Sequence, residues 1–298
     1  MSKNIQQCLR FAGQFFLLAL IFCFSTAPKD SYSFPWKAQP SEERYEVETF
    51  KDIQYYDGPD AVGYRHQLNL FVPVGKEDFP VLQFVHGSAW FIPLTFKDQV
   101  IPFIGSYEAL GEGLASRGIG VVIANHRVDE LHPAHITDVA RAWAWAYENI
   151  GTYGGDNSKM FIMGHSSGAH LAALLATDHS YLESLNVPLE SMNGVICMGG
   201  VFEVSGLDFI FGSDPEVLAQ ASPSNNVDSD LPPFMLVLGS RDWRIFWDSS
   251  IPFARQLHEN GVLYDFNIMW GHGHITSIGQ IGLEGERITG KIEDFIKW

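Results

Sequence analysis

The chain has 298 residues, of which 46% are hydrophobic and 18% are charged, a balance typical of a globular protein with a buried core. This composition excludes a disordered chain, a collagen-like repeat and a coiled coil as descriptions of the whole. The 35 acidic side chains outnumber the 19 basic ones, which gives a formal charge of −16. Because a surface this negative repels nucleic-acid phosphates and anionic lipids, we expect no nucleic-acid partner.

The first 27 residues differ in composition from the rest of the chain. Lys3 and Arg10 precede an uninterrupted apolar run over residues 15–24, and three small residues follow at 25–27. This pattern predicts a secretory signal peptide, because ten apolar residues are too few to span a bilayer. Residues 28–298 would then form one secreted or periplasmic domain. The alternative is an uncleaved N-terminal membrane anchor, which would be the only membrane contact that we expect.

Short apolar segments alternate with longer helical patterns over the remainder of the chain. Most of the apolar segments carry no polar face, which is typical of strands buried on both sides in a parallel sheet. The pattern therefore predicts a doubly wound α/β fold with helices on both faces of the sheet. Residues 201–230 are rich in Pro, Asn and Asp and are either a surface loop or a small lid or pocket wall. Strands are expected at 67–72, 81–85, 119–124, 160–163, 194–198, 234–238 and 266–270, and helices at 134–149, 168–177, 249–260 and 284–298.

One motif in the chain carries recognisable chemistry. Residues 164–168 read Gly-His-Ser-Ser-Gly and fit the pattern G-x-S-x-G between an apolar strand and a small-residue helix. This is the setting of a nucleophile elbow, in which a sharp turn holds a serine hydroxyl above the edge of the sheet. Ser166 is therefore the candidate nucleophile. The amide of Ser167, at the start of the following helix, is a candidate donor to a developing oxyanion.

A serine nucleophile needs a general base, and that base needs an acid to orient it. Asp242 follows the strand expected at 234–238, and both His272 and His274 follow the strand expected at 266–270. We expect Asp242 to be the acid and His274 to be the base. His272 remains the alternative base, and Asp248 is the alternative acid. A metal site at the two histidines is a weaker hypothesis, because no carboxylate pattern lies near them.

A second oxyanion donor is expected from the loop after an earlier strand. Residues 86–90 read His-Gly-Ser-Ala-Trp and have the form of an HGGG-type loop. Main-chain amides of Ser88 and Ala89 are the candidate donors. We expect His86 to be structural and not to carry protons.

Together, these motifs resemble the esterase and lipase branch of the α/β-hydrolase fold, particularly its HGG-x-W members. Those members include feruloyl- and acetyl-esterase-like carboxylesterases, isoprenylcysteine methylesterase and arylformamidase. The resemblance covers most of residues 60–298. Besides the motifs above, the shared features are residues 122–127, 153–156 and 231–234, and Asp138 on the helix before the elbow.

The resemblance implies a mostly parallel sheet flanked by helices, with a small cap or none. It also implies a triad of Ser166, His274 and Asp242 that works without a metal or cofactor. The chain departs from the family at Ser88, where glycine is usual. A Cβ at this position would narrow the acyl pocket or alter the loop.

The expected function is therefore that of a serine carboxylesterase, which hydrolyses small short-chain esters through an acyl-enzyme. An arylformamidase-type amidase or a peptidase is the alternative, because variable loops build the pocket for the leaving group. A non-catalytic binding protein on the same fold is a third possibility. All three triad positions are filled, which argues against it. The sequence leaves the oligomeric state open.

Overall fold

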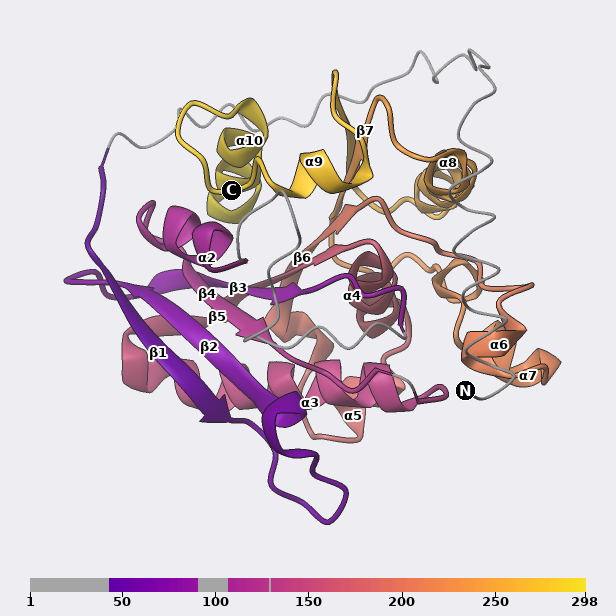
Figure 1. Cartoon of the computed structure of the whole chain (residues 1–298), viewed down its shortest axis with the longest axis horizontal. Helices are drawn as coiled ribbons and strands as arrows, with labels where there is room; N and C mark the ends of the chain where they lie inside the picture. Colours follow the sequence, from indigo (N-terminus) through magenta and orange to yellow (C-terminus); the bar gives the residue numbers. More distant parts are fainter. Residues whose placement is uncertain (1–42, 91–106, 129) are drawn as a thin grey trace, which may run out of the picture. The chain divides into compact units, whose positions relative to one another are not determined.

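Eight strands form one mixed sheet in the computed structural model, which describes residues 43–90, 107–128 and 130–298 (Figure 1). The strand order is β1-β2-β4-β3-β5-β6-β7-β8. Strand β2 runs antiparallel to both β1 and β4, whereas β3 to β8 are parallel. The predicted mostly parallel sheet is thus confirmed. The strands are β1 (Val47–Gln54), β2 (Gln67–Pro73), β3 (Phe79–Val85), β4 (Gly120–Ala124), β5 (Gly155–His165), β6 (Met192–Met198), β7 (Phe234–Gly239) and β8 (Tyr264–Met269).

Helices cover both faces of the sheet. On β3, Val81 and Val85 join one core cluster, which also contains side chains of α3, α4 and α8. The intervening Leu82 and Phe84 join the other cluster, with side chains of α2, α9 and α10. Burial on both faces explains why the central strands are apolar throughout. The helices are α2 (Tyr107–Ala115), α3 (Ala134–Asn149), α4 (Ser167–Thr177), α5 (Ser180–Glu183), α6 (Asp208–Phe211), α7 (Pro215–Gln220), α8 (Arg244–Glu259), α9 (His274–Ile278) and α10 (Arg287–Lys297).

Several elements differ from the sequence prediction, among them β1, α2 and α8. Strand β1, which was not predicted, lies at an edge of the sheet and leaves much of its length exposed, so its sequence lacks an apolar run. Helix α2 was missed because it contains two glycines, which are poor helix formers. At one of them, Gly111, a Cβ would lie 2.6 Å from the ring of Phe71, so the close packing requires glycine. Helix α8 begins at Arg244 and not at Ser249, and Pro252 lies inside it.

The segment at residues 201–230 is more than a surface loop. It contains α6 and α7, and both Phe202 and Phe211 are buried in it. The ring of Phe211 lies 5.4 Å from the ring of Trp90 and 5.3 Å from that of His170. The segment therefore packs against the residues that follow β3 and against α4.

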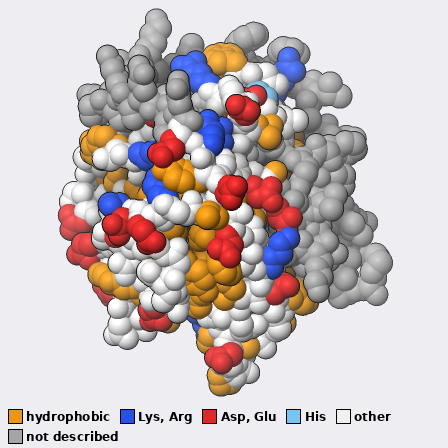
Figure 2. All heavy atoms as spheres, turned by 90° about the vertical axis from the view of Figure 1, so that its left-hand side faces the viewer, with side chains coloured by type: hydrophobic (Ala, Val, Ile, Leu, Met, Phe, Trp, Pro, Cys, Tyr) orange, Lys and Arg blue, Asp and Glu red, His pale blue; other side chains and the backbone are white. Residues whose placement is uncertain are grey.

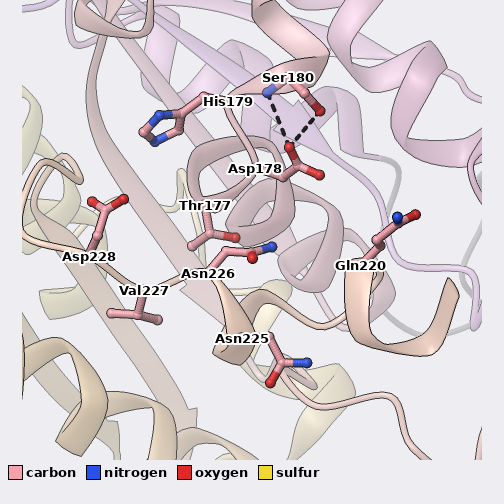
Figure 3. A pocket seen from close by; sticks show the side chains of 9 residues that line it. All are labelled: Thr177, Asp178, His179, Ser180, Gln220, Asn225, Asn226, Val227 and Asp228. Carbon is pink, nitrogen blue, oxygen red and sulfur yellow. Dashed lines mark hydrogen bonds between the residues drawn. The ribbon is translucent and has the colours of Figure 1, made fainter. Parts of the chain in front are cut away.

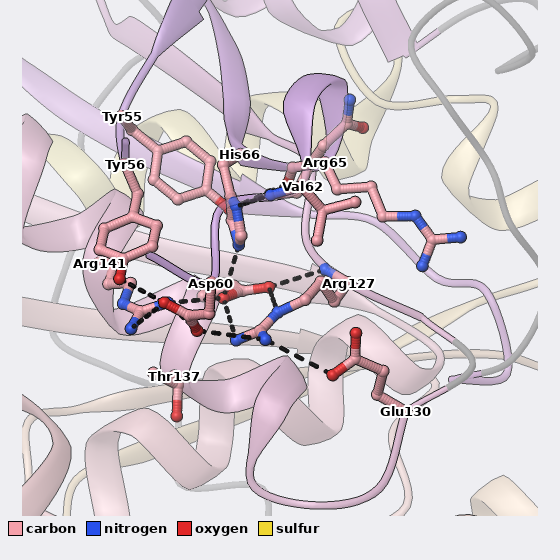
Figure 4. A network of polar contacts seen from close by, with 12 residues as sticks. Tyr55, Tyr56, Asp60, Val62, Arg65, His66, Arg127, Glu130, Thr137 and Arg141 are labelled. Carbon is pink, nitrogen blue, oxygen red and sulfur yellow. Dashed lines mark hydrogen bonds and ion pairs between the residues drawn. The ribbon is translucent and has the colours of Figure 1, made fainter. Parts of the chain in front are cut away.

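A buried polar network fixes the start of α3 (Figure 4). The carboxylate of Asp138 accepts hydrogen bonds of 2.9 Å from the backbone N–H and from Nε of Arg127. Nε2 of His66 lies 2.9 Å from its other oxygen. The N–H of Val62 donates to Nδ1 of His66, so the ring proton is on Nε2, the nitrogen that lies near Asp138. Burial alone would raise the pKa of Asp138, but these hydrogen bonds hold it below its ordinary value.

The described residues all belong to a unit that spans Ser33–Trp298, and the predicted leader at residues 1–27 lies outside them. Within the described ranges, no helix has the length and apolar character needed to cross a bilayer. Figure 2 shows the face that carries β1, where acidic and basic side chains are interspersed around an apolar patch. The described part of that face therefore offers no uniformly basic surface to a polyanion.

Candidate active site

Ser166 occupies a strained turn between β5 and α4. Its backbone has φ 58° and ψ −124°, a conformation that residues other than glycine rarely adopt and that costs on the order of 1–3 kcal/mol. The N–H of Ser166 donates to the carbonyl of Met198 at 2.9 Å, which ties the turn to the end of β6. The side chain of Ser166 is partly exposed. This is the geometry expected of a nucleophile elbow.

The glycines around Ser166 are required by close backbone contacts. A Cβ at Gly164 would lie 2.1 Å from the carbonyl oxygen of Gly168. A Cβ at Gly168 would lie equally close to the carbonyl oxygen of Val85. At Gly87, a Cβ would lie 2.8 Å from Cβ of Ser166. The elbow and the loop after β3 therefore pack directly against each other.

The structure brings Asp242 and His274 together. Nδ1 of His274 lies 3.0 Å from Oδ1 of Asp242, and both side chains are almost fully buried. The carboxylate also accepts a hydrogen bond of 2.8 Å from the N–H of Trp243. With the proton of His274 on Nδ1, Nε2 is left as an acceptor. Nε2 is buried and has no hydrogen-bond partner among the described residues.

The His274 ring is held by neighbours that the sequence analysis did not identify. The ring of Phe246 stacks on it at a centroid distance of 4.0 Å, and the ring of His165 lies 4.5 Å away. Nε2 of His165 also hydrogen-bonds to the carbonyl of His274 at 3.0 Å. Since His165 directly precedes Ser166, this contact joins the imidazole to the elbow.

Gly199 is a further residue that the sequence analysis missed. It directly follows Met198, which binds the Ser166 amide, and a Cβ on it would lie 2.9 Å from Nδ1 of His274. The signal in the sequence was its position after a buried strand, at the same sheet edge as the other site residues. Gly199 is thus adjacent in the chain to a residue that binds the elbow, His165 is part of the elbow, and both lie against His274.

The alternative acid and base lie in different settings. Asp248 is exposed and forms an ion pair of 3.0 Å with Arg244 on the surface of α8. The backbone carbonyl of His272 accepts a hydrogen bond from the N–H of Arg241, and its side chain is only half-buried. The geometry therefore favours Asp242 over Asp248 and His274 over His272. In the described part of the chain, no group of three or more His, Cys, Asp or Glu is arranged to hold a metal ion.

The candidate oxyanion loop also meets the elbow. The N–H of Ser88 donates to Oγ of Ser167 at 2.8 Å, so this amide is engaged by a side chain and does not point free into a pocket. Ala89 and Trp90 both have positive φ, 48° and 61°, although neither is glycine. His86 is buried, and its ring stacks on that of His126 at 4.3 Å. Burial lowers the pKa of His86 to about 4, which suits a structural role and not a proton carrier.

A cavity of about 480 Å³ lies at the other end of α4 (Figure 3). Its lining is mostly polar and includes Thr177 and Asp178. One oxygen of Asp178 accepts from the N–H and Oγ of Ser180, the first residue of α5. Because α4 has 11 residues, Thr177 lies roughly 15 Å from Ser167 at a rise of 1.5 Å per residue. The cavity is therefore separate from the site around Ser166.

The family model BD-FAE matches residues 68–257, more than half of the chain, and the match includes Ser166 and Asp242. The chain belongs to the BD-FAE family. This BD-FAE protein is 31% identical over 201 residues to the esterase LipC of Mycobacterium tuberculosis, with 60% of the chain and 48% of LipC covered. It is 26% identical over 267 residues to the isoprenylcysteine alpha-carbonyl methylesterase ICME of Arabidopsis thaliana, with 79% of the chain and 58% of that protein covered. The chain spans about half the length of the curated relatives it matches.

Solved structures with the same fold cover most of the chain. A truncated carbohydrate esterase from gut microbiota has a TM-score of 0.70 at 21% identity, and the match covers 87% of this chain and 99% of that one. Esterase B from Lactobacillus Rhamnosis has a TM-score of 0.68 at 21% identity, with 98% and 91% covered. The predicted α/β-hydrolase fold and the resemblance to its esterases are confirmed.

Proposed function

We propose that this BD-FAE protein is a serine carboxylesterase with Ser166 as nucleophile, His274 as general base and Asp242 as the acid that orients the base. The observation that carries the proposal is the buried contact of 3.0 Å between His274 and Asp242, next to the strained elbow. A plain strand-to-helix turn does not require an imidazole–carboxylate pair at the same sheet edge. The esterase names among the relatives also support hydrolysis of esters.

In the proposed reaction, Oγ of Ser166 attacks the ester carbonyl carbon while Nε2 of His274 takes the hydroxyl proton. Asp242 accepts the Nδ1 proton in a hydrogen bond and stabilises the imidazolium. The tetrahedral intermediate collapses when the alcohol leaves with the proton from Nε2, which gives an acyl-serine. A water molecule then gives a proton to the same nitrogen and attacks the acyl carbon. The second tetrahedral intermediate collapses as Nε2 returns that proton to Oγ of Ser166, which releases the carboxylic acid and restores the serine.

The negative oxygen of the intermediate needs donors, and the amides of Ser167, Ser88 and Ala89 are the proposed ones. Each such donor is worth about 3 kcal/mol in the transition state. The amide of Ser88 is bound to Oγ of Ser167. An oxyanion is a stronger acceptor than a hydroxyl, so we propose that the amide shares its proton with the oxyanion in a bifurcated hydrogen bond while it keeps its contact with Ser167.

The proposal is tested by hydrolysis of short p-nitrophenyl esters. We expect Ser166→Ala to lower kcat/KM by roughly 10⁵- to 10⁶-fold, as removal of a triad nucleophile does elsewhere. The control Ser184→Ala changes a serine exposed after α5 and should leave the rate unchanged. A fluorophosphonate should add its mass to the peptide that contains Ser166. Undiminished turnover by Ser166→Ala would remove the serine from this role.

The same assay decides the finer points of the proposal. We propose that esters with short acyl chains are preferred, so rates should fall along a series from two to ten acyl carbons. A faster reaction with an aryl formamide than with an aryl acetate would assign the chain to amide hydrolysis. We also propose that residues 1–27 are a leader removed on export. An exported protein whose mass still includes them would favour a membrane anchor.

A further inference from the structure

Trp90 lies at the end of the candidate oxyanion loop. One histidine binds its indole N–H, and another binds its backbone carbonyl. The indole N–H donates to Nδ1 of His170 on α4 at a distance of 3.2 Å. Nε2 of His135 on α3 lies 3.1 Å from the backbone carbonyl of Trp90 and donates to it. All three side chains are buried. A tryptophan that only filled the core would not need a hydrogen bond to each of two helices.

The hydrogen bonds also define the state of His170. Its Nδ1 accepts from Trp90, so its proton is on Nε2, which donates to the carbonyl of Ala221 at 2.7 Å. The ring thus joins the loop after β3 to the segment at residues 201–230. Burial lowers the pKa of His170 to about 3, and that of His135 to about 4. Both rings therefore remain neutral near pH 7, and their hydrogen bonds persist.

The loop needs such anchors because its backbone is strained. Ala89 and Trp90 follow each other in the left-handed region, where a side chain is disfavoured at each position. At the other end of this stretch, the N–H of Ser88 is fixed by Oγ of Ser167. Ser167 and His170 lie on the first turn of α4, the helix that also follows Ser166. One rigid helix therefore carries the nucleophile at its start and two anchors of the loop.

We propose that His170 is a positioning residue whose hydrogen bond to Trp90 sets the oxyanion loop against Ser166. The inference rests on the proposed esterase function. Without the bond, residues 88–90 can relax from their strained backbone, and their amides move from the place where the negative oxygen forms. The transition state then loses hydrogen bonds that the bound substrate does not yet make, so kcat decreases while KM changes little.

The test breaks the bond from both ends and uses a matched control. Trp90→Phe removes the indole donor, and His170→Gln keeps a nitrogen near Nε2 but removes the acceptor at Nδ1. His170→Asn places its amide oxygen where Nδ1 lies and keeps the acceptor. Trp143→Phe is the control, because it removes another buried indole bond of 3.2 Å, to Ser191, which directly precedes β6. Rates are expressed per active site labelled by a fluorophosphonate, so unfolded protein does not count.

We expect a 10- to 100-fold lower kcat for Trp90→Phe and His170→Gln, with KM within threefold of the unmodified protein. The double variant should be no slower than either single one, and His170→Asn should recover most of the rate. The inhibition constant of a trifluoromethyl ketone, which forms a tetrahedral oxyanion on serine, should rise as kcat/KM falls. A kcat equal to that of Trp143→Phe, or a change in KM alone, would overturn the inference. Absence of ester turnover by the unmodified protein would instead refute the proposed function, and this inference with it.

Discussion

Replacing Gly199 by alanine should separate the buried Asp242–His274 pair. A methyl carbon on Gly199 would lie 2.9 Å from Nδ1 of His274 and 3.2 Å from Oδ2 of Asp242. Ordinary contacts of carbon are about 3.5 Å, so the imidazole must retreat by about half an ångström. The ring is already in contact with Phe246 and His165. It cannot move away without lengthening its hydrogen bond to the carboxylate.

The effect on folding and the effect on catalysis have different sizes. Gly199 has φ +58°, and an alanine in this region costs about 1 kcal/mol of folding free energy relative to glycine. Misplacing a catalytic group by 1 Å can cost about 10²-fold in rate, and disabling the orienting acid of a triad costs about 10⁴-fold. We therefore expect Gly199→Ala to lower kcat/KM by about 10²-fold, or about 2.7 kcal/mol. This exceeds the loss of stability.

Gly261 provides a matched control for this experiment. It has φ +76°, and no atom lies within 4 Å of a Cβ built on it. Gly261→Ala should therefore lower the free energy of unfolding in urea by about 1 kcal/mol through its positive φ alone, with kcat/KM unchanged. Ester hydrolysis per labelled active site is compared for the two variants. Equal kcat/KM values for Gly199→Ala and Gly261→Ala would show that the pair tolerates the methyl group, and the reasoning would be refuted.

Further predictions concern the acid, the buried histidines and the buried carboxylate. Asp242→Asn should lower kcat by about 10⁴-fold, whereas Asp248→Asn should change it less than twofold; comparable losses in both would remove the distinction between them. Burial lowers the pKa of His86 to about 4 and that of His170 to about 3, while an unfolded histidine titrates near 6.5. Between pH 6.5 and 4 the unfolded chain thus binds more protons, and each ring should reduce stability by up to about 1.4 kcal/mol per pH unit as the pH falls. A flat unfolding free energy between pH 7 and 5 would contradict this. Asp138→Asn should cost about 3–5 kcal/mol in urea unfolding, because it removes the buried carboxylate that pairs with Arg127 and leaves that guanidinium only the exposed Asp60 and Glu130, and a loss below 1 kcal/mol would show that the network contributes little.

The sequence predicted the candidate triad because of how parallel sheets are built. The carboxyl ends of parallel strands meet at one edge, so residues that follow β5, β7 and β8 are brought together however far apart they lie in the chain. Ser166, Asp242 and His274 each follow such a strand. The paired glycines around Ser166 added a local signal, since only glycine allows the backbone contacts of the elbow.

The parts that were missed lack a local pattern of this kind. Strand β1 is an exposed edge, so burial does not select apolar residues along it. Gly199 is required by a contact with His274, a residue that follows a different strand. One signal was available for the anchors of the oxyanion loop. His170 lies in the first turn of the helix that follows Ser166, among mostly small and apolar residues, and a buried polar ring needs hydrogen-bond partners.

The conformation of the oxyanion loop is decided by contacts over long stretches of the chain. The bond from Ser88 to Ser167 joins residues 79 positions apart, and the bond from Trp90 to His170 joins residues 80 apart. Both bonds end on the first turn of α4, so a shift of that helix would carry the nucleophile and the loop together. Since neither bond leaves a period or a spacing in the sequence, the motifs at 86–90 and 164–168 predict that the loop and the elbow meet, but only the folded structure shows which side chains join them.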